Sequence, residues 1–218
     1  RQTDGSWELP LEAMEAAVTP ATRLLLFCHP HNPLGRVWRK EELTKLVEFC
    51  RRHDLVLCSD ELHCDLILDP LRHVPAATLP DAAGLTITLM SPSKTYNVAG
   101  LQFAYAIIPD PALRQAFRRA GAGFMEPDYP GWFGIAAAEA AYTGAGEWLE
   151  QLLSYLRGNR DLVESFVQER LPRVGITHAE ATYLAWLDAG GQGLEEPVKA
   201  CLRAGVALSD GVHFGARV

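Results

Sequence analysis

The sequence lacks a cysteine pattern that would define its class. Its five cysteines are an odd number among 218 residues, and no two of them form a C-x-x-C pair. A disulfide framework is therefore poorly supported, and buried free thiols in a reducing compartment are the simplest interpretation. We accordingly expect a cytoplasmic protein. The run Cys28-His29-Pro30-His31 could suggest zinc, but no second ligand cluster has matching spacing, so we expect no metal.

Long apolar runs and clusters of like charge are absent as well. No uninterrupted apolar stretch is long enough to cross a membrane, and the opening RQTDGSWELP lacks the apolar core of a signal peptide. The net charge is −7 with acids and bases interspersed, and no basic stripe is present. We therefore expect neither a membrane nor a nucleic-acid partner.

What is present is an ordinary globular composition, 48% hydrophobic and 22% charged, in which short apolar runs alternate with amphipathic segments. The predicted strands are LLLFC (24–28), LVLCSD (55–60), LTITLMS (85–91), QFAYAII (102–108), TYLAWLD (182–188) and VALSD (206–210). The predicted helices cover about 40–53, 110–121, 131–143, 146–170 and 194–205.

This alternation, with fully apolar strands, predicts an α/β fold: a parallel or mixed sheet with helices on both faces. We place a boundary inside the long helix near residue 150. Residues 1–150 then form a large domain, and residues 151–218 form a smaller α+β unit.

Three predicted strands end in polar clusters, HPHNP, SDELH and SPSK. Ligands of such sheets bind at the carboxyl ends of the strands, so these groups are expected to meet at one edge. Lys94 follows a buried strand between small hydroxyl residues, which suits a lysine that forms a Schiff base. Ser91 and Ser93 could hold a phosphate. The alternative is a solvated lysine in a turn.

Asp60 ends the second predicted strand, and Asn32 lies in the turn that follows the first. A carboxylate at a sheet edge can pair with a pyridinium nitrogen, although an aspartate there can equally cap a helix. Asn32 offers a donor and an acceptor to a ligand oxygen, although Asn-Pro is also a common turn. A cis peptide bond before Pro33 is compatible with this sequence.

In chain order these clusters read N-P-x-G, S-D-E-x-H and S-P-S-K-T-x-N-x-A-G-L. That order resembles the class I/II aminotransferases, which depend on pyridoxal 5'-phosphate (PLP) and have the type I PLP fold. The segments HNPLGRVWRKEEL, SDELHCDL, SPSKTYNVAGLQFAYAI, ATYLAWLD and GVALSDGVHFG look like the cystathionine β-lyase, or C–S lyase, branch of that group. The resemblance covers nearly the whole chain.

The resemblance implies a role for each residue. Lys94 would hold PLP covalently and later move the Cα proton, and Asp60 would pair with the pyridine nitrogen. Asn32 would contact the phenolic oxygen of the cofactor, and Ser91 and Ser93 would contribute to the phosphate site. His63 stands where many aminotransferases carry a tyrosine that touches the same oxygen; a structural histidine is the alternative. The resemblance also implies a small amino-acid substrate and a homodimer.

The chain departs from the pattern of the family at both ends. It starts at Arg1 without a methionine and stops at Val218, before the arginine that would clamp a substrate carboxylate. The part that would supply a phosphate-gripping loop and an aromatic residue over the ring would lie upstream of Arg1. We therefore interpret the sequence as a fragment.

The activity that the resemblance implies is β-elimination from cystathionine or a related cysteine conjugate, giving pyruvate, ammonia and a thiol. Two alternatives remain open. One is an aminotransferase, which shares the removal of the Cα proton. The other is an inactive truncated product.

Overall fold

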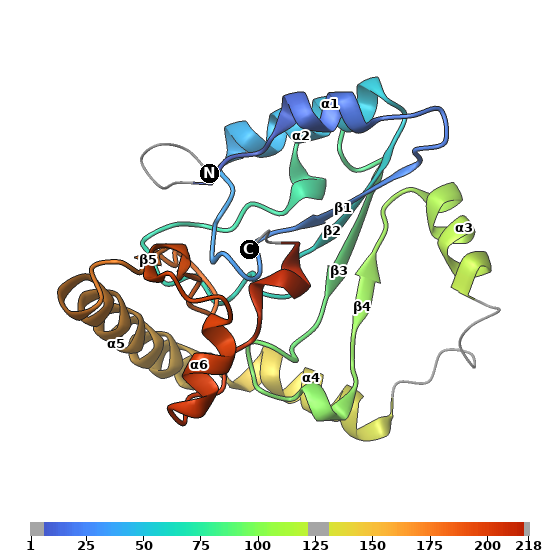
Figure 1. Ribbon diagram of the computed structural model, residues 1–218. Helices are drawn as coiled ribbons and strands as arrows, with labels where there is room; N and C mark the ends of the chain where they lie inside the picture. The colour runs from blue at the N-terminus through green and yellow to red at the C-terminus, as the bar shows by residue number, and fades with distance from the viewer. Residues whose placement is uncertain (1–6, 122–130, 216–218) are drawn as a thin grey trace.

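The computed structural model describes residues 7–121 and 131–215, and its centre is a four-stranded sheet (Figure 1). The strands are β1 (Leu24–Cys28), β2 (Val56–Asp60), β3 (Thr86–Met90) and β4 (Tyr105–Ile107), in that spatial order. The first three are parallel, and β4 runs antiparallel to β3. The expected mixed α/β sheet is confirmed.

Six helices and a short second sheet accompany these strands in the described part of the chain. The helices are α1 (Leu11–Ala17), α2 (Lys40–Arg52), α3 (Pro111–Gly121), α4 (Trp132–Gly144), α5 (Gly146–Arg170) and α6 (Pro197–Arg203). The second sheet pairs β5 (Gly175–Ile176) with β6 (Leu187–Asp188) in antiparallel fashion. Short 3-10 helices cover Ala76–Thr78, Ala99–Leu101, Gly190–Gln192 and Gly211–Phe214.

The main core lies between α2 and one face of the sheet. Leu43, Leu46 and Val47 recur on one side of α2 and are buried, and they join the same apolar cluster as Phe27 of β1 and Leu57 of β2. The helix begins where the Glu42 carboxylate accepts the Arg39 backbone N–H at 2.7 Å. This packing holds the parallel strands in register, so their carboxyl ends meet at one edge.

The other face of the sheet is covered less completely. Leu113 of α3 packs against Cys58, Ile87 and Ile108 there. On β1, by contrast, Leu24 and Leu26 remain 47% and 75% exposed among the described residues. Helices thus contact both faces, as expected, but β1 is covered only on the α2 side.

The region after α5 departs from the sequence-based expectation. Of the strand predicted at 182–188, only Leu187–Asp188 pairs with another strand. The strand predicted at 206–210 is wrong: no ladder forms there in the described residues, and Val206 and Leu208 are about half exposed. Its alternating pattern has no neighbouring strand to pair with. The boundary expected near residue 150 falls inside the unbroken α5 and stays a prediction.

The described residues also bear on membranes, thiols and metals. No helix among them combines the length and apolar character needed to cross a bilayer. All five cysteines are free, and burial raises the pKa of the Cys50 thiol to about 11. No group of three or more metal-ligating side chains gathers in the described ranges.

Candidate active site

Asp60 ends β2, between Cys28 of β1 and Leu89 of β3 in the sheet register. Because side chains alternate along a strand, Asp60 lies on the face of Cys58, opposite Ser59 and Glu61. Its Oδ1 accepts the backbone N–H of Leu62 at 3.2 Å, and the residue is half-buried. The carboxylate is therefore held at the strand end while part of it stays accessible.

His63 lies within electrostatic range of both Asp60 and Lys94. Burial lowers the pKa of His63, the Asp60 carboxylate acts to raise it, and the Lys94 ammonium acts to lower it further. The residue is 4% exposed, and its Nδ1 has no hydrogen-bond partner among the described residues. The structure thus places three of the residues that the sequence singled out within electrostatic range of one another, and burial disfavours the charged form of the imidazole.

Lys94 lies in the turn that follows β3 and is half-buried. No ion pair to its amine is found in the part of the chain that the structure describes. The next residue, Thr95, is 1% exposed, and its hydroxyl has no described partner. Buried polar groups without a described partner at His63 and Thr95 fit a polar ligand bound in this region.

Ser91 and Ser93 brace the same turn. Their hydroxyls lie 2.5 Å apart, Ser91 Oγ donates to the Phe103 carbonyl at 2.6 Å, and it accepts the Ser93 N–H at 3.0 Å. Because the Ser91 hydroxyl gives its proton to the Phe103 carbonyl, the Ser93 hydroxyl donates its own proton to Ser91 Oγ. The half-buried Ser93 would have to turn away from Ser91 to donate to an anion.

Asn32 lies in the turn after β1, and both the His29–Pro30 and the Asn32–Pro33 peptide bonds are cis. Its backbone N–H donates to Cys28 Sγ at 3.4 Å. Burial is the main reason that the pKa of the Cys28 thiol is raised, and the Asp60 carboxylate adds to it. Cys28 therefore links the Asn32 turn to the Asp60 end of the sheet.

The sequence reasoning missed a buried network behind Asp60. Glu61 is 1% exposed and accepts from Ser59 Oγ (2.9 Å), the Ala76 N–H (3.0 Å) and His73 Nε2 (2.6 Å). The His73 ring stacks on His29, with centroids 4.4 Å apart. The motif SDELH shows that a second carboxylate, Glu61, follows Asp60. It does not show that His73 and Ala76 bind this carboxylate.

A second missed feature is the segment around residues 180–183. The Glu180 carboxylate binds Arg36 (3.1 Å) and Arg39 and accepts the Val37 N–H at 2.8 Å. The rings of Tyr183 and His63 pack in an edge-to-face arrangement, with centroids 5.7 Å apart. A segment late in the chain thus reaches both the Asn32 turn and His63.

Taken together, the strand ends present a lysine amine, a carboxylate, a neutral imidazole and serine hydroxyls on an α/β sheet. The chain belongs to the aminotransferase class I and II family, which it matches over residues 2–217. Its α/β sheet is the fold of that family.

Within the family, the chain is similar to a cystathionine beta-lyase and to two solved structures. It is 38% identical to the cystathionine beta-lyase PatB of Bacillus subtilis over 98% of this chain and 56% of that protein. The crystal structure of OvoB superposes with a TM-score of 0.94 at 43% identity, over 99% of this chain and 57% of that one. For cystalysin from Treponema denticola, which contains PLP, the TM-score is 0.91 at 31% identity, over 99% and 56%. The chain thus spans little more than half the length of these relatives.

Proposed function

We propose that this chain is the cofactor-binding portion of a PLP-dependent C–S β-lyase that cleaves cystathionine or a related cysteine S-conjugate. The observation that carries the proposal is the grouping of Lys94, Asp60 and His63 at the strand ends of a chain similar to cystathionine β-lyases. The products would be pyruvate, ammonia and a thiol. The substrate would be a small amino acid.

The residues present fit PLP. Lys94 supplies an amine without a described ion-pair partner, Asp60 a partly accessible carboxylate for the pyridine nitrogen, and Ser93, with Ser91 behind it, hydroxyls for the phosphate. Asn32 and His63 would face the phenolic oxygen. When bound, PLP supplies an electron sink that stabilises negative charge at Cα.

Lys94 has the central chemical role in this proposal. Its amine would take the Cα proton of the substrate, because it would lie beside Cα. Asp60 would hold the pyridine nitrogen in its protonated form. The lowered pKa of the buried His63 disfavours a second positive charge beside Lys94. Removal of the proton would be followed by departure of the thiolate from Cβ.

The first test is borohydride trapping of PLP on the purified chain, followed by peptide mass mapping. We expect a phosphopyridoxyl label on Lys94, and we expect Lys94→Ala to remove it. Lys45→Ala is the matched control, because Lys45 is exposed on the far side of α2 from the core. A folded chain that takes no label, or a label that persists in Lys94→Ala, would overturn the proposal.

The second candidate is an aminotransferase, favoured by the family match itself. Both activities remove the Cα proton, so the product separates them. Pyruvate formed from cystathionine without a keto acid indicates a lyase, whereas strict dependence on a keto acid indicates a transferase. We expect the first result.

We also propose a cytoplasmic homodimer. The five free cysteines suit a reducing compartment, and large apolar side chains such as Trp132 and Phe133 are about 80% exposed in the single chain. Sedimentation analysis of the purified protein tests the dimer directly.

A further inference from the structure

We infer that Tyr183 forms a wall of the active site and selects a sulfur-bearing substrate side chain. This inference rests on the proposed function and deepens it. The ring of Tyr183 packs against the ring of His63 in an edge-to-face arrangement. The charges of Asp60 and Lys94 both affect the pKa of His63. His63 is 4% exposed, whereas Tyr183 is 48% exposed. One side of the tyrosine therefore contacts the site, and the rest remains available to a ligand.

The backbone that presents Tyr183 is held in an unusual conformation. Thr182 has a φ of 71° and is fully buried. A β-branched residue disfavours this left-handed region, and such conformations persist only where the surroundings impose them, often at binding sites. The Thr182 hydroxyl accepts the Leu184 N–H at 3.2 Å, which helps to fix the turn. The conformation sets the direction of the next side chain.

Main-chain hydrogen bonds on both sides impose this conformation. The Ala181 N–H donates to the Gly35 carbonyl at 2.9 Å, and the Thr182 N–H donates to the Leu66 carbonyl at 2.8 Å. Gly35 itself has a positive φ, and a side chain there would come within 2.8 Å of the Ala181 carbonyl. The segment thus lies between the turn that carries Asn32 and the loop that follows His63, and Tyr183 is delivered beside both.

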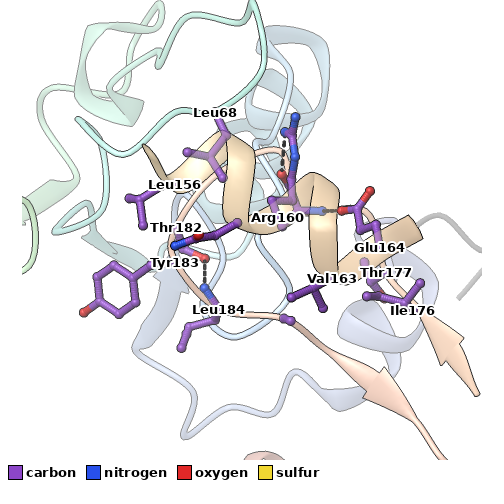
Figure 2. A pocket seen from close by; sticks show the side chains of 13 residues that line it. Leu68, Leu156, Arg160, Val163, Glu164, Ile176, Thr177, Thr182, Tyr183 and Leu184 are labelled. Carbon is purple, nitrogen blue, oxygen red and sulfur yellow. Dashed lines mark hydrogen bonds between the residues drawn. The ribbon is translucent and has the colours of Figure 1, made fainter. Parts of the chain in front are cut away.

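The position of the Tyr183 ring is not explained by packing into the neighbouring cavity. Tyr183 borders a cavity of about 120 Å³ beside α5. Figure 2 shows that its ring extends away from Arg160 and Glu164, while Leu184 and Val163 lie nearer to them. A ring that borders the cavity but points away from Arg160 and Glu164 and meets His63 is placed for the site.

The chemistry of the ring indicates the class of side chain that it would select. A thioether sulfur makes favourable contacts at the edge of an aromatic ring, whereas an ether oxygen of the same shape gains much less there. A cysteine S-conjugate carries such a sulfur two bonds from Cα, close to the Lys94 amine in the proposed reaction. Tyr183 would thus favour the sulfur compound over its oxygen analogue.

The test compares two ligands on the PLP-loaded full chain. They are the α-methyl derivatives of S-methyl-L-cysteine and O-methyl-L-serine, which have no Cα proton and therefore bind without elimination. Dissociation constants are taken from the change in cofactor absorbance. The variants are Tyr183→Leu and Tyr183→Val, which remove the ring, and Tyr183→Phe, which keeps it. Tyr155→Leu on α5, where Tyr155 is 68% exposed, is the matched control.

We expect the two aliphatic variants to lower the preference for sulfur over oxygen by about 2- to 10-fold, the range expected for a sulfur–ring contact. Tyr183→Phe and Tyr155→Leu should keep the wild-type preference. An unchanged preference in a folded, PLP-loaded aliphatic variant would overturn the inference alone, as would an equal loss in Tyr183→Phe. A wild-type chain that takes no PLP at Lys94 would overturn the proposed function and the inference with it.

Discussion

The parallel sheet and the segment after α5 both contain short strands, but the two regions are stabilised differently. Leu43, Leu46 and Leu57, between the sheet and α2, are completely buried. After α5, the strands are two residues long, and Leu194 and Leu202 are 49% and 60% exposed. The sheet is therefore stabilised by its own core, whereas the later segment depends on hydrogen bonds to the Gly35 and Leu66 loops.

The largest expected difference in the free energy of unfolding concerns carboxylates that are hydrogen-bonded inside the protein or at its surface. Glu61→Ala removes a buried carboxylate and leaves His73, Ser59 Oγ and the Ala76 N–H without it. Loss of one partner from a buried pair costs about 3–5 kcal/mol. We expect a drop of that size in the free energy of unfolding, measured by urea denaturation.

The control for Glu61 is Glu196→Ala, which removes the exposed ion pair with Lys199 on α6. Solvent screens that pair, so we expect no measurable change in unfolding. Equal effects of the two variants would contradict the proposed contrast between the regions.

A smaller difference in the free energy of unfolding is expected when a leucine is shortened to alanine in the two regions. Leu46→Ala leaves a cavity in the α2 core and should lower the free energy of unfolding by about 2–5 kcal/mol. Leu202→Ala, at an exposed position of α6, should change it by no more than about 0.5 kcal/mol. Chemical denaturation of both variants checks this, and a large effect of Leu202→Ala would reveal a core in the later segment.

The smallest effect should come from His178, which joins the later segment to α5. Burial acts to lower its pKa, but hydrogen bonds to Glu164 (2.8 Å) and Asp69 (3.0 Å) raise it above 6.5 overall. Because the folded pKa is raised, this stabilisation is complete below the unfolded value and is lost as pH rises through the folded value.

Asp69 sets the lower limit of the pH range in which its hydrogen bond with His178 stabilises the protein. Although burial acts to raise its pKa, hydrogen bonds from His178 and Arg160 lower it below 3.8 overall, so its contribution is lost as pH falls through the folded value. We expect the melting temperature of the wild type to fall relative to that of His178→Gln as the pH rises above 6.5, through the raised pKa of His178. Melting temperatures that change with pH in the same way for the two proteins would disprove this.

The sequence predicted the sheet well because its strands are apolar on both faces and end in polar turns. It predicted the grouping of Asp60 and Lys94 for the same reason, since parallel strands end at one edge. It could not give the direction of β4, because an apolar run has no orientation. VALSD was assigned wrongly because alternation also fits an exposed extended segment.

The site residues that sequence reasoning missed depend on tertiary contacts. Glu61 could be seen next to Asp60, but its buried role depends on His73 and Ala76, which no spacing rule connects to it. Tyr183 reaches His63 only because Thr182 takes a positive φ that its residue type disfavours. The roles proposed for Asn32, Ser91, Ser93 and His63 stay predictions.

The hydrogen bonds from Ala181 to Gly35 and from Thr182 to Leu66 also bear on the order of folding. They join a late part of the chain to two early ones, and contacts between distant residues form slowly because a long loop must close first. The sheet and α2 can assemble on the ribosome while residues 179–183 are still being made. The site would then acquire its tyrosine wall after Asp60, His63 and Lys94, and a chain interrupted before residue 183 would carry Lys94 without it.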